Sequence, residues 1–371
     1  MRTRTIAAVL LAGALALTAC SSGSAPSGTP GSTGETTTAT EKPAETINIV
    51  GFAVPEAANK AIAAAFAETE AGANVTFKTS YGASGDQSRA VVAGLKADYV
   101  HLSVATDVDR LVDAGLVDAA WDDGPNKGIV STSIVVLGVR EGNPLNIQGW
   151  DDIVKPGVEI VTPNPASSGA ARWNALAAWG HVTENGGTEE EATQFLDALF
   201  ANVVSLTNSG RDATQAFLGG TGDVLLAYEN EAILAAQNGQ GFEYVIPETS
   251  LLIENPGAIL EEATPAASDW LDFVLSPDGQ KQFALKGFRP VNTEEPGAVD
   301  LDAYGLKAED IEGAADGSDP FPAVTHLLTL EANFGGPGWG AIKDKFFGDG
   351  KDGNPLGIVT DAIAKSGKAT Q

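Results

Sequence analysis

The chain has 371 residues and carries 49 acidic but only 22 basic side chains, which gives a formal net charge of −27. Nucleic acids and anionic lipid surfaces need a basic face, so this charge excludes them as expected partners. The length is sufficient for two lobes with a sizeable hydrophobic core.

The N-terminus has the layout of a bacterial secretory signal. Arg2 and Arg4 precede an apolar run over residues 6–17, which is too short to span a membrane and leads to Cys20. Cys20 is the only cysteine, so no disulfide can form within the chain. We predict a signal peptide over residues 1–19 and a lipid on Cys20 that anchors the exported protein to the outer face of the cell membrane. An ordinary cleavable signal with a chance cysteine is the alternative.

Residues 20–45 consist largely of Ser, Thr, Gly, Pro and Ala, which predicts a disordered linker because so few apolar groups cannot offset the entropy of ordering. From Ile47 onward, short apolar strands alternate with helical segments. In chain order we expect strands at 47–50, 75–79, 99–104, 134–139, 158–161, 203–206, 224–228 and 251–257. We expect helices at 55–66, 86–95, around 111–112, at 169–179, 189–200 and 211–218, and a broken helical segment at 324–347.

This alternation predicts an α/β fold with a mostly parallel sheet that is covered by helices on both faces. The strands at 134–139 and 251–257 would carry the chain into a second lobe and back, which gives two crossing segments and a hinge. The predicted lobes are 46–133 together with 257–330, and 134–256; residues 331–371 are predicted to be a C-terminal helical segment.

Four places in the body share one pattern, in which a strand leads through small residues into a helix. These junctions are Val54-Pro55, Ser84-Gly85, Ser168-Gly169-Ala170 and Gly210-Arg211, two in each predicted lobe. The first amides of a helix are unpaired and carry roughly half a positive charge, so each junction suits an anion. Ligands bind beyond the carboxyl ends of parallel strands, where the four junctions can converge on a tetrahedral oxyanion. A single Ser-Gly pair before a helix is also compatible with an ordinary helix cap.

Three segments of the body resemble the sulfate-binding proteins of bacterial sulfate/thiosulfate importers. Residues 80–95, 150–180 and 222–234 keep most of the family runs Ser-His-Gly-Gly-Ser-Gly, Pro-Asn-Pro-x-x-Ser-Gly-Gly-Ala-Arg-Trp and Gly-Asp-Val-Leu-x-x-Trp-Glu-Asn-Glu-Ala. The similarity extends from about Ile47 to Phe288-Arg289-Pro290. It implies a two-lobed periplasmic-binding-protein-like fold of type II and an exported receptor that delivers sulfate to an ABC permease, with no cofactor.

The resemblance also implies which groups enclose the anion. They are the main-chain amides of Val54, Ser84, Gly169, Ala170 and Gly210, the hydroxyl of Ser168 and the side chain of Tyr228. Three of these positions depart from the family. Val54 replaces an Asp whose contact is through the backbone, and Ala170 replaces a Gly, which requires ordinary helical dihedrals at that residue. Tyr228 replaces a Trp; an indole only donates a hydrogen bond, whereas a phenol donates or accepts, so the exclusion of hydrogen phosphate is in question.

Alternatives remain for several side chains near the junctions. Tyr228 either contacts the anion or only walls the cleft. Arg172 and Arg211 either contact the anion or brace the loops by bonding to carbonyl groups or to Glu229 or Glu231, and the resemblance favours bracing. Two tryptophans, Trp173 and Trp179, follow the apolar face of one helix and are predicted to be core residues.

Two other function classes fit the sequence poorly. A secreted serine hydrolase would need a nucleophile elbow, and Ser84, Ser168 and Ser209 lie in none, while His101, His181 and His326 lie in unrelated contexts. A metal site is not expected either, because no histidine pair has metal-ligand spacing and the run 349–354 lacks the closing Glu of a calcium loop. We therefore expect a monomeric binding protein rather than an enzyme, with thiosulfate, molybdate and tungstate as alternatives to sulfate.

Overall fold

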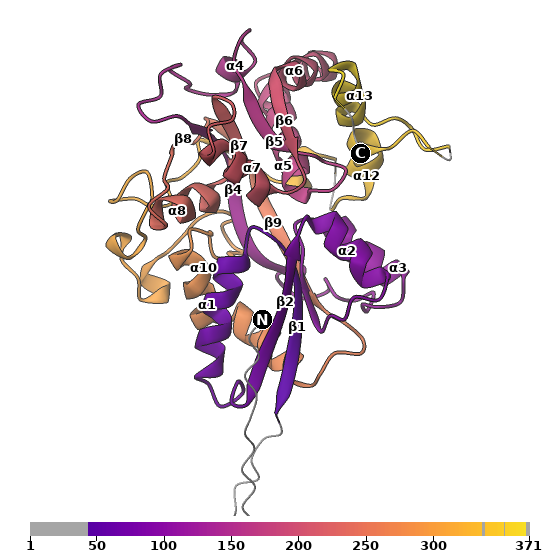
Figure 1. The fold of residues 1–371 in the computed structure, drawn as a ribbon, viewed down its shortest axis with the longest axis vertical. Helices are drawn as coiled ribbons and strands as arrows, with labels where there is room; N and C mark the ends of the chain where they lie inside the picture. The colour runs from indigo at the N-terminus through magenta and orange to yellow at the C-terminus, as the bar shows by residue number, and fades with distance from the viewer. Residues whose placement is uncertain (1–43, 336–337, 352, 369–371) are drawn as a thin grey trace, which may run out of the picture. The chain divides into compact units, whose positions relative to one another are not determined.

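The structure is a computed structural model and describes residues 44–335, 338–351 and 353–368 (Figure 1). Three parallel strands form the N-terminal lobe, with β1 (Glu45–Phe52) between β2 (Val75–Gly82) and β3 (Tyr99–His101). The helices α1 (Glu56–Ala67), α2 (Ser84–Val92) and α3 (Ala105–Asp113) each follow one of these strands. Later in the chain, α9 (Ala266–Leu275) and α10 (Pro277–Leu285) pack against α1 of the same lobe.

The second lobe repeats this arrangement. Here β5 (Ile160–Pro163) lies between β6 (Val203–Thr207) and β7 (Val224–Tyr228), again in parallel. The helices of this lobe are α4 (Trp150–Ile153), α5 (Gly169–Glu184), α6 (Glu189–Asn202), α7 (Gly210–Leu218) and α8 (Glu229–Gln237). A short strand, β8 (Glu243–Val245), pairs with β4 in the antiparallel sense.

Two strands of 11 residues each, β4 (Ile129–Val139) and β9 (Thr249–Ile259), join the lobes. They pair with each other in the antiparallel sense, and beyond this shared stretch β4 pairs with β7 whereas β9 pairs with β3 (Figure 1). The resulting strand order is β2-β1-β3-β9-β4-β7-β5-β6. The expected fold class is confirmed: each lobe is a mostly parallel sheet flanked by helices, and two crossing segments connect them.

The segment that we expected to be helical at 324–347 is only partly so. It begins with a strand, β10 (His326–Leu328), which pairs in parallel with the first residues of β9, and continues through α11 (Leu330–Asn333) to α12 (Gly340–Phe347). A three-residue strand is too short to show a period in sequence, and only the open edge of β9 selects it. The polar stretch before it contains two 3₁₀ turns, Asp302–Tyr304 and Ala308–Asp310.

The C-terminal helices pack on the second lobe. The last of them, α13 (Ile358–Lys365), contacts α6, and Lys365 forms an ion pair with Asp197 at 3.0 Å. Lys345 of α12 forms a second ion pair, with Glu189, at 2.6 Å. These contacts cover α6 with residues that are distant in sequence.

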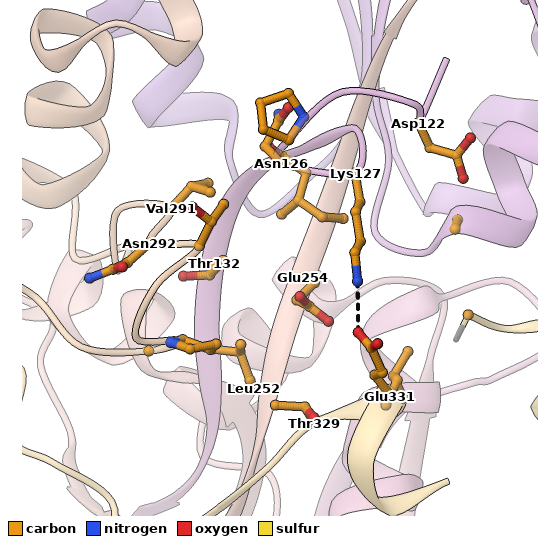
Figure 2. A pocket seen from close by; sticks show the side chains of 18 of the residues that line it. Asp122, Asn126, Lys127, Thr132, Leu252, Glu254, Val291, Asn292, Thr329 and Glu331 are labelled. Carbon is orange, nitrogen blue, oxygen red and sulfur yellow. Dashed lines mark hydrogen bonds and ion pairs between the residues drawn. The ribbon is translucent and has the colours of Figure 1, made fainter. Parts of the chain in front are cut away.

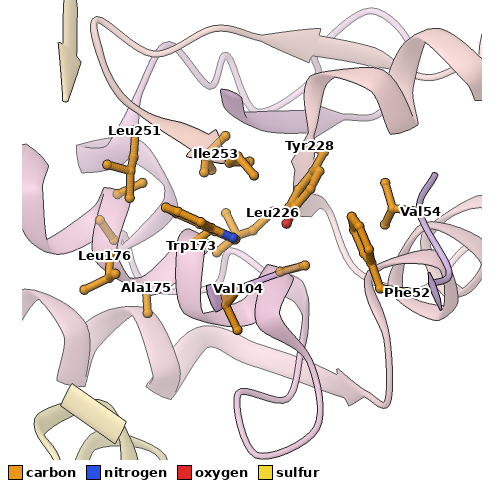
Figure 3. Packing of buried hydrophobic residues seen from close by; sticks show 14 of the residues in the cluster. Phe52, Val54, Val104, Trp173, Ala175, Leu176, Leu226, Tyr228, Leu251 and Ile253 are labelled. Carbon is orange, nitrogen blue, oxygen red and sulfur yellow. The ribbon is translucent and has the colours of Figure 1, made fainter. Parts of the chain in front are cut away.

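The two tryptophans of α5 are core residues, as expected. Trp173 is fully buried and Trp179 nearly so. Figure 3 shows Trp173 among apolar side chains of both crossing and helical segments, including Leu176 and Leu251. Trp173 also packs edge-on against Trp339, with ring centroids 4.8 Å apart. Because α5 is held this firmly, its N-terminus has a fixed position.

The predicted signal peptide, Cys20 and nearly all of the predicted linker lie outside the described residues. Among the residues that are described, no helix combines the length and apolarity needed to cross a membrane.

Candidate anion-binding site

Three of the four helices that start at the junctions lack side-chain caps; the fourth, α7, is capped by Ser209, which accepts from the Asp212 amide. Thr188 and Ser276 each accept a hydrogen bond from an amide in the first turn of the helix that follows them. Ser168 occupies the same N-cap position of α5, yet its side chain makes no capping bond. The first and second helices also begin without a side-chain cap, at Pro55 and Ala83. Ser168 is therefore not an ordinary cap, and its hydroxyl is uncommitted.

Five main-chain amides at the junctions are also uncommitted. Within the described part of the chain, the N–H groups of Val54, Ser84, Gly169, Ala170 and Gly210 donate to no protein carbonyl or side chain. Four of them belong to the first or second residue of α2, α5 or α7, where a helix offers no internal acceptor. Ala170 lies within α5 and does not have a positive φ. Its backbone is therefore helical, as the replacement of the family's Gly by Ala requires.

The four junctions meet at one place. A Cβ atom added to Gly210 would lie 3.2 Å from Val54 Cγ2 and 3.3 Å from Ala170 Cβ, so three junctions are within van der Waals range of one another. The fourth is attached through the Gly85 N–H, which donates to the Ser167 carbonyl oxygen at 2.9 Å. Val54 and Gly85 belong to the N-terminal lobe and the others to the second lobe. The uncommitted amides therefore come from both lobes.

Tyr228 lies at the end of β7 and is buried, with its ring beside Phe52 (Figure 3). Its hydroxyl oxygen lies 2.8 Å from Ser103 Oγ and accepts a hydrogen bond from Asn255 Nδ2 at 3.4 Å. Burial raises the pKa of Tyr228, so the phenol keeps its hydrogen. A Cβ atom on Gly169 would lie 2.5 Å from the same Ser103 Oγ, which places the Tyr228 hydroxyl close to the start of α5.

Ser103 and Asn255 were missed by the sequence analysis. Ser103 lies between β3 and α3, which is a fifth strand-to-helix junction, and α3 also begins without a side-chain cap. The signal used for the other four junctions would have found it. Asn255 is a buried polar residue within the apolar strand β9, and only the tertiary structure shows that it faces the same place.

Ser84 presents its amide rather than its hydroxyl. The Ser84 hydroxyl donates to Asp107 Oδ2 at 2.6 Å and accepts from the Ser103 amide at 2.9 Å, so it is fully used within the protein. Asp107 is buried, and its charge is balanced by Arg110 at 2.9 Å. A carboxylate this close to the junctions therefore opposes a bound anion less than an unpaired one would.

Both arginines near the junctions brace the protein. Arg172 donates from Nε to the Pro165 carbonyl oxygen at 3.1 Å and from Nη1 to Thr106 Oγ1 at 3.2 Å. Arg211 forms an ion pair with Glu231 at 2.7 Å and donates to the Val54 carbonyl oxygen at 3.0 Å. Of the two carboxylates considered as partners of these arginines, only Glu231 forms such an ion pair, with Arg211.

The other carboxylate, Glu229, is buried and pairs with Arg289 at 2.8 Å instead. This second ion pair connects the start of α8 to the segment that follows α10.

The histidines do not pair with the junction serines. His101 bonds to Asn59 and Ser131 at 3.2 and 3.1 Å, and burial lowers the pKa of His101 to about 3. Among the described residues, none of the hydroxyls of Ser84, Ser168 and Ser209 is hydrogen-bonded to a histidine. Each of these three junction serines therefore lacks the histidine partner of a Ser-His catalytic pair within the described residues. In the same part of the chain, no group of three His, Cys, Asp or Glu side chains is placed to hold a metal ion.

A cavity of about 560 Å³ lies elsewhere, on the crossing strands (Figure 2). Its charged lining is mostly acidic and consists of Asp122, Asp123, Lys127, Glu254 and Glu331. Lys127 is already paired with Glu331 at 2.7 Å, and burial raises the pKa of Glu254. Such a lining disfavours an oxyanion, and none of the seven predicted anion-binding residues lines this cavity.

Residues 47–289 match the family model described as bacterial extracellular solute-binding protein. The chain belongs to this family. The solute-binding protein is 40% identical to the sulfate-binding protein of Synechococcus elongatus, over 82% of this chain and 84% of that relative. It is 36% identical to the thiosulfate-binding protein of Pseudomonas aeruginosa, over 76% of this chain and 82% of that relative.

Among solved structures, this solute-binding protein is similar to the sulfate-binding protein SubI from Mycobacterium tuberculosis H37Rv. The TM-score is 0.73 and the identity 40%, and the match covers 82% of this chain and 99% of that chain. The resemblance noted from the sequence runs is thereby confirmed, and the family match includes all seven predicted anion-binding residues.

Proposed function

We propose that this solute-binding protein is an exported receptor for sulfate, which it binds between its two lobes and delivers to an ABC permease. The observation that supports the proposal is the close packing of the junctions that carry five unpaired amides and the uncommitted Ser168 hydroxyl. Sulfate carries two charges and no proton at neutral pH, so a set of hydrogen-bond donors matches it. The names of the sulfate-binding relatives point the same way.

The proposed ligand groups are the seven expected from the resemblance. They are the amides of Val54, Ser84, Gly169, Ala170 and Gly210, the hydroxyl of Ser168, and the hydroxyl of Tyr228. Backbone dipoles rather than a cationic side chain would neutralise the anion, since Arg172 and Arg211 are used for bracing. Groups from both lobes contact the ligand only in the closed state, so binding favours closure.

The family match supports export, and we extend it to the parts of the chain outside the described residues. We propose cleavage after residue 19, lipid attachment at Cys20 and a linker over 20–45 that ties a monomeric body to the membrane. The proposed lobes are 46–133 with 257–330, and 134–256, followed by the C-terminal segment 331–371.

Thiosulfate is the second candidate ligand. One relative that matches most of this chain is a thiosulfate-binding protein, and thiosulfate has the same charge and nearly the same shape as sulfate. Molybdate and tungstate remain further candidates on shape alone.

Thermal unfolding of the full chain tests the proposal. Sulfate, thiosulfate, molybdate and phosphate are compared with chloride at equal ionic strength, because a ligand that binds only the folded state raises the melting temperature. Sulfate or thiosulfate should give the largest increase. If no tetrahedral oxyanion raises the melting temperature more than chloride does, the proposed function is wrong.

A further inference from the structure

Ser103 is held at the meeting point of the junctions by side chains from three other elements. Its amide donates to Ser84 Oγ at 2.9 Å, and its carbonyl oxygen accepts from Trp173 Nε1 at 2.9 Å and from Asn255 Nδ2 at 3.0 Å. The residue is fully buried, and its Oγ would lie 2.5 Å from a Cβ atom added to Gly169. The Ser103 hydroxyl is therefore fixed against the first residue of α5, whose amide is unpaired.

The Ser103 and Tyr228 hydroxyls form a pair across the two lobes. Their oxygens are 2.8 Å apart, and either oxygen can be the donor. Asn255 Nδ2 donates to the Tyr228 oxygen at 3.4 Å, so that oxygen already accepts one hydrogen bond. One hydroxyl hydrogen lies between the two oxygens, and the other is left for a further partner. The donor and the acceptor of the hydrogen bond between Ser103 and Tyr228 can therefore exchange roles.

Most other groups at the site differ from this pair in one respect. The five unpaired amides can only donate, so they cannot receive a proton that a ligand carries, whereas the Ser168 hydroxyl can donate or accept. We propose that Ser103 Oγ is a further ligand-binding group, and that the Ser103–Tyr228 hydroxyl pair accepts the proton of a monoprotonated tetrahedral oxyanion such as hydrogen phosphate. The inference rests on the proposed function and widens its ligand class.

The hydrogens balance for both kinds of ligand. With hydrogen phosphate, the ligand O–H donates to Ser103 Oγ, the Ser103 O–H donates to the Tyr228 oxygen, and the Tyr228 O–H donates to a second ligand oxygen. With sulfate, both hydroxyls turn to donate to the ligand and the bond between them is lost. A ligand with two protons would need a second acceptor, so dihydrogen phosphate is disfavoured.

The test is isothermal titration of the full chain with sulfate and with inorganic phosphate at mildly alkaline pH, where phosphate carries one proton. Ser103→Ala should weaken sulfate binding several-fold. The loss of phosphate affinity should be at least about tenfold larger than the loss of sulfate affinity, because the proton of hydrogen phosphate then loses its proposed acceptor. Tyr228→Phe should change the ratio in the same direction. Phosphate binding by the unchanged protein should weaken at mildly acidic pH, whereas sulfate binding should not.

Ser133→Ala is the matched control. Ser133 is also fully buried, its hydroxyl has no hydrogen-bond partner, and it lies in β4. This variant should bind both anions as the unchanged protein does. Ser168→Ala provides a second comparison, because the Ser168 hydroxyl is the other group at the site that can accept a proton. A selective loss of phosphate binding in Ser168→Ala but not in Ser103→Ala would assign the acceptor role to Ser168 and overturn the proposal.

The outcomes separate the two proposals. Binding of sulfate with no change in the sulfate-to-phosphate ratio in Ser103→Ala overturns the role of Ser103 but leaves the receptor function intact. Undetectable phosphate binding by the unchanged protein overturns the acceptor role of the pair. Absence of binding of every oxyanion by the unchanged protein overturns both proposals.

Discussion

At the scale of single residues, the proposed site depends on polar groups that make no hydrogen bond within the described protein. Ser168 stands where a serine normally caps a helix, but its hydroxyl makes no capping bond. By contrast, the neighbouring Ser84 hydroxyl is fully used by Asp107 and Ser103, and only its amide is available. Two serines in similar sequence contexts therefore offer different atoms to a ligand.

Ser168→Ala should weaken sulfate binding by about 1.5–3 kcal/mol, the range for a hydrogen bond to a charged group. It should leave the stability of the ligand-free protein nearly unchanged, because the side chain caps nothing. Ser276→Ala is the reciprocal control: Ser276 accepts a hydrogen bond from the Gly279 amide, so its loss should lower stability by about 1 kcal/mol without affecting binding. Calorimetric titration and urea unfolding measure the two effects, and the reverse pattern would contradict the assignment.

Gly169→Ala should abolish or strongly weaken binding through a steric effect. The new Cβ would lie 2.5 Å from Ser103 Oγ, and Ser103 is held by three hydrogen bonds to its backbone and cannot move away freely. Gly149→Ala is a suitable control, since an added Cβ there meets no atom within 4 Å and the backbone φ of −178° is extended. Equal affinities of these two variants for sulfate would refute the close approach.

At the scale of secondary-structure elements, braces hold the helix N-termini in place. Arg211 connects the start of α7 to Glu231 of α8 and to the Val54 carbonyl oxygen of the other lobe. Glu231 is buried and also accepts from Thr214. The brace therefore positions two junctions while its charge is neutralised by Glu231.

Arg211→Ala should destabilise the protein by about 3 kcal/mol, because it leaves the buried Glu231 carboxylate without its partner. The double variant Arg211→Ala, Glu231→Gln should recover part of this loss, since the unpaired charge is then removed. Urea unfolding of the single and double variants measures the difference. If the double variant is no more stable than the single one, the bracing interpretation of Arg211 fails.

At the scale of the whole molecule, the chain has a net charge of −27, yet the proposed site would bind an anion through mainly neutral hydrogen-bond donors. Two buried carboxylates close to the junctions are paired, Asp107 with Arg110 and Glu231 with Arg211. More distant surface carboxylates are screened by salt beyond about 8 Å. The acidic surface and the proposed anion site are therefore compatible.

Buried His101 should make the stability of the whole molecule depend on pH. Burial lowers the pKa of His101 from 6.5 to about 3, so below pH 6.5 the unfolded state binds a proton that the folded state refuses. Stability should fall by about 1.4 kcal/mol for each pH unit below this value. Urea unfolding at about pH 7 and about pH 4.5 should show a loss that is smaller by about 2.7 kcal/mol in His101→Gln. Equal losses in both proteins would contradict this assignment.

The sequence by itself determined the class of the fold and, to within two residues, the positions of four helix N-termini. The strand at Val224–Tyr228 and the two crossing strands are recognisable because a short apolar run between turn residues is typical of a buried strand. The start of α5 at Gly169 follows from the small-residue run before it. The start of α2 lies at Ser84 rather than at the predicted residue 86, because one helical turn is compatible with several start points.

Only the tertiary structure decided which polar groups lie close together and which donors and acceptors have no hydrogen-bond partner within the protein. Ser103 and Asn255 come from separate elements, and hydrogen bonds between distant segments bring them to Tyr228. The strand β10 exists because β9 offers an open edge, which no local pattern records. Propensity and capping act over a few neighbouring residues, whereas pairing and hydrogen-bond satisfaction depend on groups that are far apart in the chain.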